Sequence, residues 1–206
     1  HPMGLTVAEM TVKAPSGIKL AVAGKAGYDR VKQRARLREA FDELADYLEA
    51  LAEKRYEAEE KKAERPIKVP PAKARELGKA RIRDEDLDDK HRNLYLLTQG
   101  RLDAFVSCPG AADVPFAIAF AKTHGFLART TFCLGGEAYK AVDALKATGR
   151  PVVLPPGLTH REVNPANGRE EATFLGKIFA DAGIRFGLQT FISASYAERY
   201  LWYQAA

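Results

Sequence analysis

The side chains that could do chemistry in this sequence lie where three apolar segments end. The segment 103–110 carries Ser107 and Cys108, the segment 130–136 carries Cys133, and the segment 184–190 carries Gln189. A cysteine nucleophile needs a neighbouring base and a lowered pKa, and we identify no His or Asp close in sequence that would act on either thiol. The 24 residues between the two cysteines make no zinc motif. We therefore interpret them as buried core thiols, with a pair that lines a pocket as the alternative.

The histidines add one further candidate position. His91 falls in a charged helical stretch, and His124 precedes Gly125 where a helix should end, which is an ordinary capping position. His160 and Arg161 fall after the apolar segment 151–154, in a stretch that we predict to be a surface loop. Because this loop should lie at the functional face, His160 and Arg161 are the best polar candidates for contacting a ligand.

The elements that must position these residues alternate regularly. Continuous apolar strands followed by amphipathic helices predict an α/β fold with a parallel sheet, whose chemistry lies at the carboxyl ends of the strands. Four such units suit half of a (β/α) TIM-type barrel. A doubly wound sheet is the alternative, although no phosphate-binding loop favours it. The predicted strands are 103–107, 130–134, 151–154 and 184–189, and the predicted helices are 112–124, 137–148, 169–182 and 194–206.

The first hundred residues do not follow the βα alternation of the rest of the chain. Residues 1–30 form an irregular lead-in, with a short strand within 16–24. Residues 31–100 form a charged helical insertion, in which helix 31–64 should project its end into solvent before the prolines that follow, and a second helix over 84–99 should begin at Asp84 as N-cap. The first helix has an apolar stripe at alternating spacings of four and three: Leu37, Phe41, Leu44, Leu48 and Leu51.

Charge distribution and hydropathy argue against some classes of protein function. The 206 residues carry a net charge of +5, but basic and acidic side chains are interleaved through the insertion, which argues against nucleic-acid binding. We find no apolar run of membrane-spanning length and no signal peptide, which favours the cytoplasm. We expect the units in 101–206 to be truncated at both ends, so that the chain is an internal segment of a longer protein.

Several segments resemble the amidohydrolase superfamily, in particular bacterial members similar to imidazolonepropionase. The opening residues resemble the stretch before a helical insertion in those proteins, and Arg36-Leu-Arg-Glu-Ala-Phe41 is similar to the start of that insertion. The other matching segments resemble the helix after a metal-binding strand, the next units, and the strand before a catalytic aspartate: 111–121, Gly136-Glu-Ala-Tyr-Lys140, 150–155 and 182–190.

The resemblance implies metal-assisted hydrolysis with histidine and aspartate ligands, often to zinc. It places one histidine within 107–109, a second at Leu134 and the aspartate at Phe191, and none of these positions carries a ligand of that kind. An H-x-H expected further upstream would lie before the chain begins. The resemblance therefore implies a barrel that has lost its metal site, with no cofactor expected in this chain.

Three hypotheses follow. The first is a noncatalytic amidohydrolase-like barrel segment with a binding or structural function, in which a small-molecule ligand would contact residues such as Ser107, Cys108 and Gln189. The second is a hydrolase of non-peptide carbon–nitrogen bonds, whose divalent metal, such as zinc, is held with parts outside this chain. The third is a protein-interaction module that associates through helix 31–64. A homo-oligomer or the remainder of the barrel is the partner that we expect for an open sheet.

Overall fold

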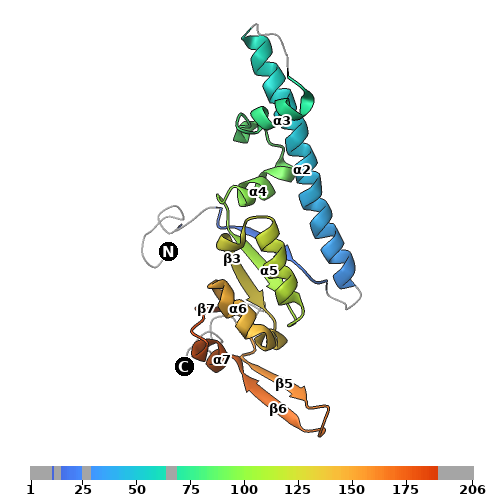
Figure 1. Cartoon of the computed structure of the whole chain (residues 1–206). Coiled ribbons are helices and arrows are strands. Elements are labelled where there is room, and N and C mark those ends of the chain that lie inside the picture. Colours follow the sequence, from blue (N-terminus) through green and yellow to red (C-terminus); the bar gives the residue numbers. More distant parts are fainter. Residues whose placement is uncertain (1–10, 12–14, 25–28, 64–68, 190–206) are drawn as a thin grey trace.

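The computed structural model describes residues 11, 15–24, 29–63 and 69–189 of the chain. A five-stranded sheet forms its centre, and a long helix with two shorter ones stands at one end (Figure 1). The helices and strands, in chain order, are β1 Ile18–Ala21, α2 Asp29–Lys62, α3 Pro71–Lys79, α4 Asp89–Thr98, β2 Ala104–Cys108, α5 Asp113–Thr123, β3 Thr130–Leu134, α6 Val142–Thr148, β4 Val152–Leu154, β5 Thr159–Val163, β6 Glu170–Phe174, α7 Leu175–Asp181 and β7 Phe186–Leu188, with short 3-10 turns η1 Asp84–Asp86, η2 Leu127–Arg129 and η3 Gly136–Ala141.

The sheet is parallel throughout, and its strands follow one another in the order β1-β2-β3-β4-β7. A doubly wound sheet reverses direction at a switch point, whereas strands in a barrel are added in sequence around an arc. The order without reversal therefore favours the barrel of the two predicted arrangements. The predicted α/β class with a parallel sheet is confirmed, and the short strand expected within 16–24 is β1.

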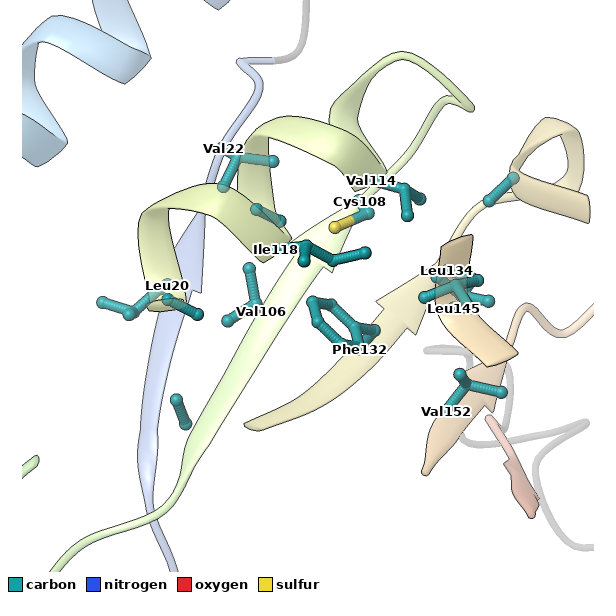
Figure 2. Close-up of a cluster of buried hydrophobic side chains, with 14 of the residues drawn as sticks. Leu20, Val22, Val106, Cys108, Val114, Ile118, Phe132, Leu134, Leu145 and Val152 are labelled. Carbon is teal, nitrogen blue, oxygen red and sulfur yellow. The ribbon is translucent and has the colours of Figure 1, made fainter. Parts of the chain in front are cut away.

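The core lies between this sheet and the helices α5, α6 and α7. Alternate residues of β2, β3 and β4 are buried against these helices, as the fully buried Phe132 and Val152 illustrate (Figure 2). Because side chains alternate across a strand, the residues between them point to the opposite face of the sheet. We call this opposite face the inner face. In the part of the chain that the structure describes, no helix covers it.

The helical insertion packs on itself as well as on the sheet. Helix α2 begins at Asp29, close to the predicted start, and its residues Leu37, Phe41 and Leu44 are buried. The prediction that the end of α2 projects into solvent is wrong, because α3 packs along the far half of α2 and buries Ala52 and Tyr56 (Figure 1).

Two features of the insertion differ from the prediction. Helix α3 was not expected, and it begins at Pro71, where a proline is tolerated because the first helical N–H has no intrahelical partner. The helix predicted over 84–99 is split into η1 and α4. Its N-cap is Asp88, which accepts a hydrogen bond from the backbone N–H of His91 at 2.8 Å, and not Asp84.

An antiparallel hairpin, β5–β6, replaces both the predicted loop around His160 and the start of the predicted helix 169–182. The helix begins only at Leu175. Figure 1 shows the hairpin projecting from the end of the molecule opposite α3. The predicted helix 194–206 lies outside the described residues. No described helix combines the length and the apolar character that a bilayer crossing requires.

Candidate functional site on the inner face of the sheet

A cavity of about 430 Å³ lies on the inner face of the sheet. Its walls come from strands that are far apart in sequence, which include the two edge strands. The residues that line it are Lys19, Leu20, Ala21, Phe105, Ser107, Cys133, Val153 and Gln189. Three of the side chains named from the sequence alone, Ser107, Cys133 and Gln189, are therefore brought together, although more than 80 residues separate the first from the last.

The curvature of the sheet creates this cavity. Strands β1 and β7 form opposite edges of the sheet, yet Lys19 of β1 and Gln189, which directly follows β7, line one space. The backbone N–H of Gln189 donates to the carbonyl of Leu154 at 3.1 Å, which extends the β4–β7 ladder to this residue. A sheet whose edges approach a common space is concave on that side, as in the wall of a barrel.

The cavity has apolar walls and few polar groups. Phe105 and Val153 supply apolar surface, while the Ser107 hydroxyl, the Gln189 amide and the Lys19 ammonium supply the polar contacts. Among the described residues that line the cavity, Lys19 is the charged one. Apolar walls with a few convergent polar groups are typical of small-molecule sites, whose volumes are roughly 300–1,000 Å³.

The two cysteines point to opposite faces of the sheet. Cys108 is fully buried, and Figure 2 shows its sulfur among the core side chains beside Val114 and Ile118. It therefore does not line the cavity, in contrast to the pocket-lining role considered for it. Burial raises the pKa of the Cys108 thiol to about 12, and the Asp113 carboxylate adds to this shift. Burial also raises the pKa of the half-buried Cys133, while the charge of Lys19 opposes the rise. Neither thiol is activated as a nucleophile.

In the part of the chain that the structure describes, the strand ends of the inner face do not carry the set of donors that a catalytic zinc ion needs. Within 107–109 the side chains are a hydroxyl, a core thiol and a proline ring, and Leu134 is buried in the core rather than turned toward the cavity (Figure 2). Phe191, the third expected position, lies outside the described residues. Among the residues that the structure describes, no three His, Cys, Asp or Glu side chains are grouped to hold a metal ion. The donor set of these strand ends therefore does not fit zinc.

His160 and Arg161 lie away from the cavity. His160 belongs to β5 and lies against Gly136, at the start of η3. There the hairpin meets η3 through Glu162, which accepts hydrogen bonds from the Tyr139 hydroxyl at 2.7 Å and from the Lys140 ammonium at 2.5 Å. The Lys140 hydrogen bond, followed by that of Tyr139, lowers the pKa of Glu162.

Arg161 points to the other side of the hairpin, where its guanidinium pairs with Glu170 at 2.9 Å. We therefore interpret the contact between the hairpin and η3 as structural. Glu137 lies in the first turn of η3.

A buried carboxylate at the carboxyl end of β2 was missed by the sequence analysis. Asp113 is fully buried and accepts a hydrogen bond from the backbone N–H of Gly110 at 3.0 Å. Its Oδ1 atom also lies 2.7 Å from Arg30 Nε and 3.0 Å from Arg34 Nη2, both on α2. Asp113 therefore fixes the turn after β2 and joins it to the insertion. The one sequence signal was an acidic residue at the start of an otherwise apolar helix.

The comparisons with known proteins give one structural match. The chain is similar to the crystal structure of an amidohydrolase from Thermotoga maritima MSB8, with a TM-score of 0.54 and 20% sequence identity. The match covers 89% of this chain and 44% of that protein, so the chain spans less than half of its length. No family model and no curated protein matches the sequence. The described fold is thus α/β and corresponds to part of an amidohydrolase-type barrel.

Proposed function

We propose that this chain is a segment of an amidohydrolase-like barrel, related to imidazolonepropionase, that binds a small organic molecule on its inner face without metal-dependent hydrolysis. One observation carries the proposal. The cavity gathers a hydroxyl, an amide and an ammonium between apolar walls, at the strand ends where the family would place imidazole and carboxylate ligands. These groups can donate and accept hydrogen bonds, but they do not form a zinc site.

The roles of the lining residues follow from their chemistry. Phe105 and Val153 would contact the apolar body of the ligand, and the Ser107 hydroxyl and the Gln189 amide would orient it by hydrogen bonds. Cys133 would contribute a weakly polar surface, because its raised pKa keeps the thiol protonated near neutral pH.

Binding of the neutral dye N-phenyl-1-naphthylamine to the full-length protein tests the proposal. Ser107→Trp would fill the cavity and should weaken the fluorescence-detected affinity at least about tenfold, because the indole occupies the space that the dye needs. Ser16→Trp is the matched control, because Ser16 is exposed and does not line the cavity. Equal affinities for the two variants, both with native circular dichroism, would refute the binding site.

A hydrolase of non-peptide carbon–nitrogen bonds is the second candidate. The solved amidohydrolase is more than twice as long as the region that matches this chain, which leaves room in a longer protein for ligands beyond these strands. In that case zinc or another divalent ion would be the cofactor, and the inner face would supply substrate contacts. A titration of the full-length protein with zinc distinguishes the two candidates.

Two further features support proposals on the partner and the compartment of the protein. Strands β1 and β7 have unpaired outer edges in the described part of the chain, so we propose that the remainder of the barrel or a second copy of the chain pairs with them. Both cysteines are free, which supports a reducing compartment such as the cytoplasm. Association through α2 remains a weaker proposal, because Leu37, Phe41 and Leu44 are already buried within the chain.

A further inference from the structure

We infer that the inner face selects an organic anion, and that Lys19 is the residue that recognises its negative charge. This inference rests on the proposed function and adds the chemical class of the ligand. The geometry that carries it is the position of a lysine on the concave side of the sheet, in a cavity whose described lining residues include no acidic side chain.

The position of Lys19 in the sheet is fixed by its neighbours. Lys19 lies in β1, in register with Phe105 of β2, and it occupies the same face as Ala21 and Ser107. The alternate residue Leu20 is buried in the core, so the strand cannot turn Lys19 toward the helices without exposing Leu20. The ammonium is therefore held on the side of the cavity.

The charge of Lys19 lacks a protein counter-ion in this part of the chain. No ion pair joins Lys19 to a carboxylate among the described residues, in contrast to Arg30, Arg34 and Lys140, whose carboxylate partners lie within 4 Å. The Lys19 side chain is exposed on this side of the sheet, so its charge is available to an anion that lies beside the apolar walls. The charge of Lys19 reaches across the cavity, because it opposes the rise in the pKa of Cys133.

The ligand that best complements this surface has an apolar body, one anionic group and one group able to exchange hydrogen bonds. The anion would lie on Lys19, the apolar body on Phe105 and Val153, and the remaining polar group near Ser107 and Gln189. A carboxylate or sulfonate joined to a ring system satisfies these requirements. A cationic ligand would meet like charge at Lys19 and find no carboxylate among the lining residues.

Two dyes with the same ring system isolate the charge. The anion 1-anilinonaphthalene-8-sulfonate differs from neutral N-phenyl-1-naphthylamine by its sulfonate. With the full-length protein, Lys19→Gln should weaken binding of the sulfonate about five- to tenfold, as expected for a part-exposed charge-assisted contact. The same substitution should leave the affinity for the neutral dye within about twofold. Lys146→Gln is the matched control, because Lys146 is an exposed lysine of α6 that does not line the cavity.

The outcomes separate the inference from the proposed function. If Lys19→Gln weakens only the sulfonate, and Ser107→Trp weakens both dyes, the inference is supported. If both dyes bind and respond to Ser107→Trp but neither responds to Lys19→Gln, the anion preference is overturned and the binding site stands. If neither dye responds to Ser107→Trp, the proposed binding site itself fails, and the inference fails with it.

Discussion

Replacement of Asp113 should uncouple the helical insertion from the sheet. The carboxylate is fully buried, and it receives the Gly110 N–H and two guanidinium groups of α2. Asp113→Ala leaves Arg30 and Arg34 without their shared partner, and it leaves the turn after β2 without the hydrogen bond that closes it. We therefore expect a loss of stability well above that of an ordinary surface substitution.

The magnitude follows from the burial of the three partners. Removal of one member of a buried ion pair costs about 3–5 kcal/mol, because the remaining charge is left without compensation. Here the Arg30 and Arg34 side chains are 38% and 23% exposed, so water can solvate both after the carboxylate is lost. We expect a decrease of about 2–3 kcal/mol in the free energy of unfolding, below the fully buried case. Asp113→Asn should lose less, because its amide oxygen can still accept the Gly110 N–H.

Urea unfolding of the full-length protein, followed by circular dichroism, measures this change. The matched control is Asp181→Ala, since Asp181 also pairs with a basic residue, Lys177 at 2.8 Å, but is 63% exposed. The control should lose less than about 0.5 kcal/mol. If Asp113→Ala and Asp181→Ala have the same free energy of unfolding, the assignment of Asp113 as the residue that joins the insertion to the sheet is refuted.

Two further predictions test the packing of the two halves of the chain. Iodoacetamide at pH 8 should modify Cys133 before Cys108 in the folded protein, because a pKa of about 12 leaves almost no thiolate at Cys108. Mass spectrometry of the peptides measures the order of modification. Modification of Cys108 first would contradict its place in the core. Gly78→Ala should destabilise the insertion by about 1–3 kcal/mol, because the new Cβ would lie 1.9 Å from the Ala52 carbonyl and force α3 away from α2. Gly157→Ala, whose Cβ meets no atom within 4 Å, should leave the melting temperature almost unchanged, and an equal loss in the two variants would contradict the close contact.

The strands and helices of the sheet layer could be predicted because burial against the helices selects apolar residues in the strands. Val106 and Phe132 are examples, and the helices between the strands have the apolar spacing of covering helices. The hairpin could not be predicted in the same way. β5 and β6 are mostly exposed, so their residues are polar, and cross-strand contacts such as Arg161 with Glu170 carry little sequence signal.

The insertion illustrates two other limits of sequence reasoning. Pro70 and Pro71 were interpreted as a helix stop, whereas a proline at the first helical position is equally compatible with a helix start. The acidic stretch 84–89 contains several residues that can cap a helix, and only the tertiary structure selects Asp88.

The candidate site could also be predicted only in part from the sequence. Their position where apolar segments end was enough to name Ser107, Cys133 and Gln189, but the face on which each lies depends on the register of the sheet. Cys108 is adjacent to Ser107 in sequence and therefore points into the core. The role of Asp113 depends on arginines 79 and 83 residues away, a distance at which no local pattern could predict the contact.

The metal content of the full-length protein, purified without chelator and without a histidine tag and then titrated with zinc, decides whether the inner face is a metal site. We expect far less than one zinc, iron or manganese ion per chain and no saturable zinc uptake, because the described strand ends on the inner face do not provide histidine or carboxylate ligands. About one tightly bound ion per chain would contradict this expectation. That result would favour the hydrolase whose metal site is completed outside this segment.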